Sequence, residues 1–144
     1  MSASSESYRN TNIMTASPME LIIMLYDEAI KSLTKAEDAF KIEGPERIQE
    51  VNNNLLHVQD IITELTSSLN FEKGGQIATN LYNLYDFMIY QLSQANVKKQ
   101  LKPVREVRAM LKELREAWIK VAEKEPHNEN DIPHHATSGI MVAG

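Results

Sequence analysis

The amino-acid sequence predicts an all-α fold, an antiparallel four-helix bundle of the up-down type. Apolar residues recur at helical spacing in four long segments, and no segment shows the alternation typical of a strand. The few glycines and prolines fall between these helical patterns. Short connections make consecutive helices antiparallel neighbours, so a bundle is the expected architecture.

We expect a single bundle domain over residues 17–123, between a flexible N-terminal arm (1–16) and a disordered tail (124–144). The arm is polar apart from single apolar residues at Tyr8, Ile13 and Met14. The tail contains Pro, His and Asn residues and has no apolar period, which is typical of a chain that cannot bury a core.

The first helix has three start signals at its N-terminus. Ser17 is a good N-cap residue, Pro18 suits the first helical position, and Glu20 completes a capping box. Gly44-Pro45 is expected to end the helix. The predicted core face consists of Ile22, Leu25, Tyr26, Ala29, Ile30, Leu33, Ala36 and Phe40.

The other three helices are separated by equally clear breaks. The second begins near Pro45, residues 70–75 are expected to form a turn, the third covers about 76–96, and the fourth starts near Pro103. Their predicted core residues are Val51, Leu55, Val58, Ile61, Ile62, Leu65 and Leu69, then Ile77, Leu81, Leu84, Met88 and Leu92, then Val104, Val107, Leu111, Leu114, Trp118 and Val121.

The residues offer no catalytic, cofactor or metal site, so we do not expect an enzyme. The chain has no cysteine, and none of its histidines follows a Glu at the spacing that di-metal bundles require. His134-His135 is interpreted as a solvated pair. There is no secretory signal and no membrane-spanning run, which favours a cytoplasmic protein.

The net charge of −5 is unevenly distributed along the chain. Between Lys98 and Lys124, nine Lys or Arg face four Glu, so this segment carries +5 and the remainder −10. A mainly acidic body argues against nucleic acid as the principal ligand. Two interpretations remain for the basic face of the fourth helix: an ordinary solvated face, or a docking strip for an acidic partner. Its members are Arg105, Arg108, Lys112 and Arg115.

The helices carry more apolar surface than a bundle core needs. On the third helix the apolar arc covers about 160°, against roughly 100° for a typical bundle helix, and Phe87 and Tyr90 fall outside it. Exposed apolar patches usually mark partner sites. We therefore predict a partner-binding surface. For Tyr85 the alternative to a binding role is a position packed between helices, with its hydroxyl in water. The predicted binding residues are Tyr8, Ile13, Met14, Leu21, Met24, Leu56, Ala78, Tyr82, Tyr85, Phe87 and Ile89.

Two motifs resemble those of a known family. Residues 15–27 (Thr-Ala-Ser-Pro-Met-Glu-Leu-Ile-Ile-Met-Leu-Tyr-Asp), with Tyr8 before them, are similar to the start of the flagellar secretion chaperone family, FliS. Residues 72–81 and 84–88 resemble its second signature, and Leu92, Ala95-Asn96 and Glu116-Ala117-Trp118 continue it. The resemblance covers about residues 8–122. Glu28, where the family commonly has Gly, and Asn70, where it commonly has Asp, depart from the pattern near element surfaces.

The resemblance implies a cytoplasmic chaperone, monomeric or weakly dimeric, that binds the disordered C-terminal segment of flagellin as helices in apolar grooves. It implies that the chaperone prevents premature polymerisation and delivers flagellin to the export apparatus, and that the arm moves to admit the client. Two other hypotheses remain open on the residues alone. One is a self-associating helical adaptor, and the other is a weak nucleic-acid binder that uses the basic face.

Overall fold

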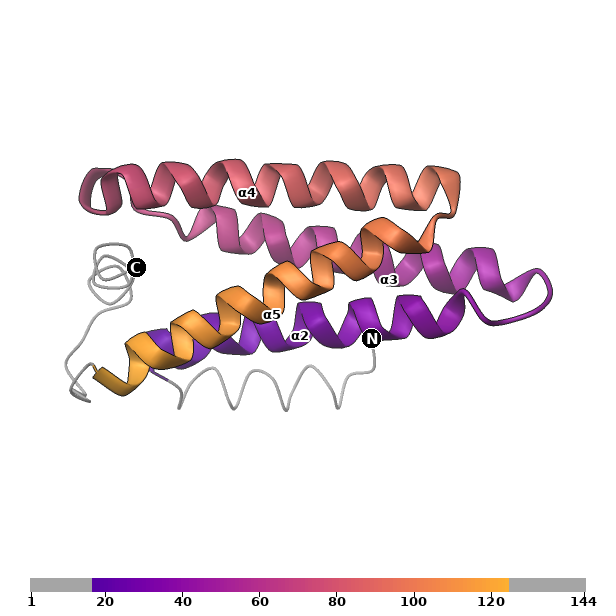
Figure 1. Ribbon diagram of the computed structural model, residues 1–144, viewed down its shortest axis with the longest axis horizontal. Coiled ribbons are helices and arrows are strands. Elements are labelled where there is room, and N and C mark those ends of the chain that lie inside the picture. Colours follow the sequence, from indigo (N-terminus) through magenta and orange to yellow (C-terminus); the bar gives the residue numbers. More distant parts are fainter. Residues whose placement is uncertain (1–16, 125–144) are drawn as a thin grey trace.

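The computed structural model describes residues 17–124, which form four α-helices. In chain order these are α2 (Pro18–Ala39), α3 (Glu46–Ser67), α4 (Phe71–Lys98) and α5 (Leu101–Lys124). Consecutive helices run in opposite directions and pack against each other, and α5 also packs against α2, so that the four close into a ring (Figure 1). The predicted antiparallel four-helix bundle is confirmed. The predicted arm and tail lie outside the described residues, except for Lys124 at the end of α5.

The start of α2 follows the predicted capping pattern. The Ser17 side chain accepts a hydrogen bond from the backbone N–H of Glu20 at 3.2 Å, and Pro18 occupies the first turn. Both features satisfy or remove N–H groups that have no partner within the helix. The entry of the chain into the bundle is therefore fixed by local sequence.

The predicted turn over residues 70–75 is only partly right, because α4 already begins at Phe71, although the chain does break from helical geometry at Gly75. Asn70 caps this earlier start by accepting a hydrogen bond from the N–H of Lys73 at 3.0 Å. Gly75 then adopts φ 52° and ψ −126°, a conformation that favours glycine and interrupts the helix. Gly75 produces a kink inside α4 and leaves one helical turn, with Phe71 at its start, ahead of the kink.

Each helix contributes one apolar stripe to a common core, as its spacing predicts. Most predicted core residues are buried, and those near helix ends or borders, such as Phe40 and Leu114, are half-buried. Within residues 17–124 no helix is both long enough and apolar enough to cross a bilayer. The largest fully buried side chains are Tyr26, Tyr85, Leu33, Leu55, Ile62, Leu65, Met88, Leu92, Leu111 and Val51.

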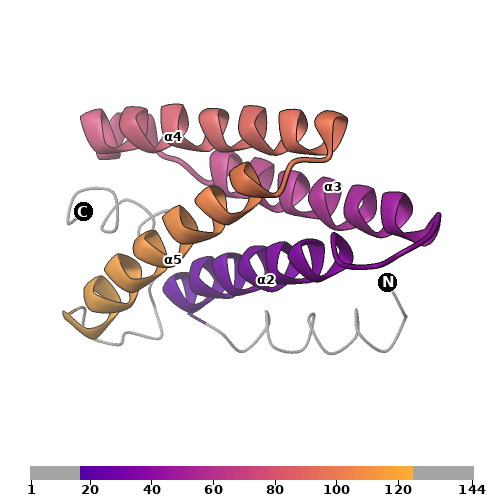
Figure 2. The same ribbon diagram turned by 45° about the vertical axis from the view of Figure 1, so that its right-hand side comes forward.

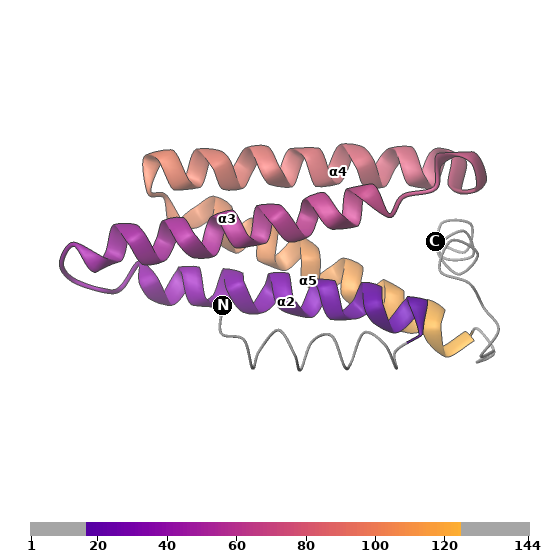
Figure 3. The ribbon, with the colours of Figure 1, turned by 180° about the vertical axis from the view of Figure 1, so that it is seen from behind.

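The helices are not equally covered by their neighbours. α2 packs most extensively, against α3 and α5, whereas α4 makes smaller contacts with α3 and α5. In all three ribbon views α4 forms one edge of the bundle, and α5 crosses from the end of α4 towards α2 (Figures 1, 2 and 3). Much of the surface of α4 therefore has no helix against it among the described residues.

Two tyrosines meet in the middle of the bundle, between helices that face each other across the ring. The hydroxyl of Tyr26 on α2 lies 2.5 Å from the hydroxyl of Tyr85 on α4. The two side chains are almost completely buried. The pair therefore satisfies two polar groups at once inside an apolar core.

Burial raises the pKa of both tyrosines above the ordinary value of 10.0. For Tyr26, the Tyr85 hydroxyl and the Trp118 indole offset part of that rise, whereas for Tyr85 the neighbouring Tyr26 adds to it. Both hydroxyls therefore stay protonated in the folded protein at neutral pH, as a hydroxyl–hydroxyl hydrogen bond requires.

Replacing one tyrosine of the pair should lower the free energy of unfolding by more than half of what replacing both tyrosines does. Tyr26→Phe leaves the Tyr85 hydroxyl buried without its partner, for a loss of about 1–3 kcal/mol in the free energy of unfolding. Adding Tyr85→Phe removes the orphaned group, so the double variant should be less destabilised than the sum of the single variants. Urea unfolding of the wild type and the three variants measures this, and strict additivity would contradict the pairing.

Stability should also fall in alkaline solution because of this pair. Above the ordinary pKa of 10.0 the unfolded chain releases these two protons while the folded chain keeps them. The contribution of the tyrosine pair to the free energy of unfolding is therefore fully present below pH 10. It declines as the pH rises above 10, by up to about 1.4 kcal/mol per pH unit for each tyrosine. Urea midpoints measured between about pH 8 and about pH 11 should decline more steeply for the wild type than for the double Phe variant. Equal slopes would contradict the assignment.

Candidate partner-binding surface

One row of side chains on α4 faces α3. Tyr82, Ile89 and Asn96 are spaced seven residues apart, so they lie within about 40° of one another around the helix. The Asn96 amide donates a hydrogen bond to the side-chain oxygen of Asn52 on α3 at 2.7 Å. This bond orients the whole row towards α3.

Leu56 supplies the opposite wall of the same surface. It lies one turn beyond Asn52 on α3, and because the helices are antiparallel it falls between the levels of Asn96 and Ile89 on α4. Leu56 is 47% exposed and Tyr82 is 44% exposed, while Ile89 between them is half-buried against the core. We call the partly exposed apolar surface formed by Leu56, Ile89 and Tyr82 the α3/α4 groove.

Phe71 extends this surface at the start of α4. Its ring packs edge-on against the ring of Tyr82, with centroids 5.9 Å apart and planes at 65°. Half of Phe71 is exposed. The sequence-based prediction missed this residue because it placed Phe71 in a turn, although Asn70 directly before it was a legible N-cap signal.

The predicted binding residues of the first helix are less exposed than expected. Leu21 and Met24 on α2 are both half-buried, so each presents part of its side chain to solvent. Tyr8, Ile13 and Met14 lie outside the described residues.

Two of the predicted binding residues are corrected by the structure. Ala78 is fully buried and Tyr85 is 2% exposed, so neither lies on a binding surface. The predicted apolar arc of α4 was wide because α4 packs against both α3 and α5, and Ala78 and Tyr85 lie on its inward face. The alternative for Tyr85, a packed ring with its hydroxyl in water, is confirmed for the ring. It is wrong for the hydroxyl, which is hydrogen-bonded to the hydroxyl of Tyr26.

Phe87 is exposed, as predicted, but on a different side of α4. At 100° per residue it lies about 140° around the helix from Tyr82. Tyr90, which is 59% exposed, is its neighbour on that outer face. These aromatic residues therefore do not belong to the α3/α4 groove.

Other exposed apolar side chains lie at the tip of the α2–α3 hairpin. Ile42 and Ile48 are both exposed, the latter to 62%. The hairpin extends beyond the α4–α5 turn in opposite views, so no third helix of residues 17–124 covers its tip (Figures 1 and 3). The exposure of Ile48 could not be predicted from spacing, because Ile48 continues the core stripe of α3. It is exposed because the helices packed against α3 end before they reach it.

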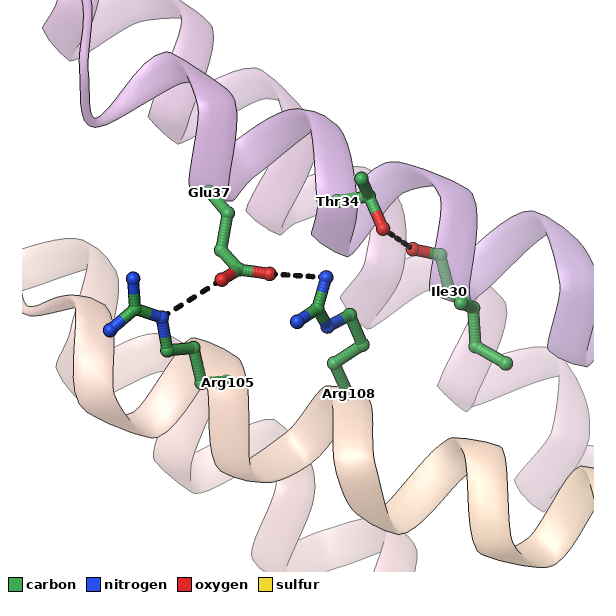
Figure 4. Close-up of polar contacts among 5 residues, drawn as sticks. All are labelled: Ile30, Thr34, Glu37, Arg105 and Arg108. Atoms are coloured by element: carbon green, nitrogen blue, oxygen red, sulfur yellow. Dashed lines mark hydrogen bonds and ion pairs between the residues drawn. The ribbon is translucent and has the colours of Figure 1, made fainter.

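The predicted docking strip on α5 is mostly occupied within the molecule. Glu37 of α2 lies between two arginines of α5, with Arg105 Nε 2.9 Å from Oε1 and Arg108 Nη1 2.6 Å from Oε2 (Figure 4). Arg115 pairs with Asp27, also on α2. These three arginines therefore pair with acidic groups of α2 that lie directly opposite them, which neither interpretation of the basic face anticipated.

Lys112 is the exception in this strip. It is exposed, and among residues 17–124 no carboxylate is recorded in an ion pair with it. Across the same range no group of three or more His, Asp or Glu side chains is arranged to hold a metal ion.

Comparison with known proteins places this helical architecture in a family. The model of the family described as flagellar protein FliS matches residues 1–125, which is most of the chain. The chain belongs to the FliS family. The match includes the segment before α2 and all four described helices, as the two sequence motifs predicted.

Several relatives share a third of their residues with this FliS family member. The flagellar secretion chaperone FliS of Salmonella typhimurium is 36% identical over 118 residues, which cover 82% of this chain and 86% of the relative. That of Bacillus subtilis is 31% identical over 133 residues, or 92% of each chain. That of Vibrio cholerae is 35% identical over 119 residues, covering 83% and 85%.

Arg108 and Lys112, one turn apart on α5, should differ in their contribution to stability. Arg108→Ala leaves the largely buried Glu37 with one partner fewer, and we expect a loss of about 1–3 kcal/mol in the free energy of unfolding. Lys112→Ala should change it by less than about 0.5 kcal/mol. Chemical unfolding of both variants provides the measurement. Equal losses of stability in the two variants would mean that the ion pairs between α5 and Glu37 of α2 do not stabilise the fold.

Proposed function

We propose that this chain is an export chaperone that binds the disordered C-terminal segment of flagellin. Membership of the FliS family supports a chaperone role, since its relatives carry the name flagellar secretion chaperone. The observation that carries the binding mode is the α3/α4 groove, where exposed Leu56 and Tyr82 flank the half-buried Ile89. The protein acts by covering apolar surface on its client rather than by chemistry.

The groove suits an amphipathic helix that folds on binding. A client segment would lay its apolar face along the row from Tyr82 to Asn96 and keep its polar face in water. Each apolar side chain that it buries contributes about 1.5–3 kcal/mol, and ordering the segment costs part of that gain. The Tyr82 hydroxyl stays at the wet rim while its ring contacts the client.

Covering the client's apolar face has two consequences for flagellin. The segment is withheld from other flagellin subunits, so premature polymerisation in the cytoplasm is prevented. The subunit also remains extended enough to be handed to the flagellar export apparatus. In this proposal the N-terminal arm moves to admit the client; its apolar residues Tyr8, Ile13 and Met14 lie outside the described residues.

Calorimetry with the C-terminal segment of flagellin from the same organism tests the proposal. We expect saturable heat with about one-to-one stoichiometry and a single complex on a sizing column, with a negative heat-capacity change from apolar burial. Absence of both heat and complex at concentrations up to about 100 µM would reject flagellin as the client.

The groove itself is tested by adding charge to its walls. Leu56→Glu and Tyr82→Glu should each weaken binding of the flagellin segment at least about tenfold, because a carboxylate must then be desolvated against an apolar helix. Ala109→Glu is the matched control, since it adds the same charge at an exposed small apolar position on α5, away from the groove.

Helicity distinguishes a variant that has lost its binding surface from one that has lost its fold. The variants should keep the circular dichroism and the unfolding midpoint of the wild type to within the small effect of a surface substitution. Unchanged affinity in both groove variants would place the binding site elsewhere. Loss of helicity would show that Leu56 and Tyr82 support the core instead.

A further inference from the structure

The residue that caps the C-terminus of α4 has an unusual backbone conformation. Lys99 has φ 51° and ψ 54°, the left-handed region in which glycine is the usual residue at a helix end. Its backbone N–H and that of Gln100 both point back to the carbonyl of Ala95. Within residues 17–124 Lys99 is the only residue other than glycine with a positive φ. Since glycine would avoid this strain, the side chain of Lys99 is a candidate for a functional role.

The side chain of Lys99 folds back to the end of the α3/α4 groove. Its ammonium Nζ lies 2.5 Å from the side-chain oxygen of Asn96, and the Asn96 amide donates in turn to Asn52 on α3 at 2.7 Å. Asn96 is the last residue of the row that begins at Tyr82 and faces α3. These two hydrogen bonds therefore hold a positive charge at a fixed place beside the apolar surface.

The ammonium of Lys99 has donor capacity that the described part of the chain does not use. An ammonium carries three N–H donors, and within residues 17–124 its recorded acceptor is the neutral amide oxygen of Asn96. No carboxylate of the same range is recorded in an ion pair with it. Burial lowers the pKa of Lys99 from its ordinary value of 10.5, because the ammonium has lost part of its hydration. Such a cation gains most from an anionic partner.

Lys98 precedes Lys99 directly but lies on another side of α4. At 100° per residue it is about 160° around the helix from Asn96, so it faces away from the groove. Lys98 is exposed, and its charge adds to the field around the end of α4 as that of Lys99 does. The two lysines therefore differ in the placement of the ammonium rather than in charge.

We propose that Lys99 binds an acidic side chain of the flagellin segment at the Asn96 end of the α3/α4 groove and so aligns the client helix. This inference rests on the proposed function and adds one charged anchor to the apolar walls. Tyr82 and Asn96 are 14 residues apart in sequence. They are thus separated by about 21 Å along α4, or about four turns of a client helix. The client would place its apolar side chains on Tyr82, Ile89 and Leu56, and its carboxylate beyond them.

A charged anchor supplies what an apolar groove lacks. A helix can slide along apolar walls by one or two turns and exchange one apolar contact for another. With Lys99 at one end, a displaced helix leaves the ammonium and the client carboxylate without each other, and both are partly desolvated. The ion pair thus disfavours the wrong registers more than it strengthens the right one.

Calorimetry with the C-terminal flagellin segment and the full chain tests the anchor by comparing Lys99→Met with Lys98→Met. Each variant removes one positive charge. We expect Lys99→Met to weaken binding about tenfold and Lys98→Met to weaken it less than about twofold. Added salt should weaken binding of the wild type and of Lys98→Met more than that of Lys99→Met. Equal affinities of the two variants would overturn the proposal.

Lys99→Gly distinguishes a role of the side chain in binding from a role in closing α4. Glycine adopts the left-handed conformation without strain, so the urea midpoint should stay at or above that of the wild type. Affinity for the flagellin segment should nevertheless fall as far as in Lys99→Met. A variant that loses stability and affinity together would show that Lys99 only ends the helix.

Exchange of charge identifies the client residue. Each Asp and Glu of the flagellin segment is replaced in turn by Lys, and one replacement should bind Lys99→Glu more tightly than it binds the wild type. Absence of such a pair would overturn the anchor. If Leu56→Glu weakens binding and Lys99→Met does not, the groove stands and the anchor alone is rejected. A wild type that does not bind the segment rejects both.

Discussion

The hydrogen bond between Tyr26 and Tyr85 governs how the bundle is closed. These two hydroxyls lie in the core, one from α2 and one from α4, and each is the other's partner. A large polar side chain is tolerated at such a position only where its hydroxyl is satisfied, so rotation of α4 about its own axis is restricted. With Tyr85 held inward, the faces of α4 that point towards α3 and towards solvent are determined by helix geometry alone.

The fixed orientation of α4 separates two surfaces that the sequence had merged into one. The row from Tyr82 to Asn96 is turned towards α3, where Asn52 holds its far end, and forms a groove with Leu56. Phe87 and Tyr90 are turned outward, where about half of each side chain is exposed. On the opposite side, α5 is joined to α2 through Glu37 and Asp27, so the basic side chains serve the fold and α4 is left as the adaptable edge.

Periodicity predicted the helices and most of the core, because both depend on local spacing. It failed where a position depends on contacts between helices. The burial of Ala78 and the pairing of Arg105 and Arg108 follow from what lies opposite them, which no single helix reveals. The exposure of Ile48 depends on where the neighbouring helices end. The start of α4 at Phe71 was missed for another reason: the glycines at 74 and 75 favoured a turn over residues 70–75, whereas Gly75 forms a kink inside the helix.

In the proposed binding mode a client helix lies in the α3/α4 groove of an otherwise unchanged bundle. The most direct measurement is a methyl-labelled NMR titration with the C-terminal segment of flagellin, with intermolecular contacts observed at the endpoint. We expect shift changes and contacts at the methyl groups of Leu56 and Ile89, while Val104 and Val107 in the core face of α5 stay unperturbed. Contacts confined to α2 or α5, with Leu56 and Ile89 unchanged, would contradict it.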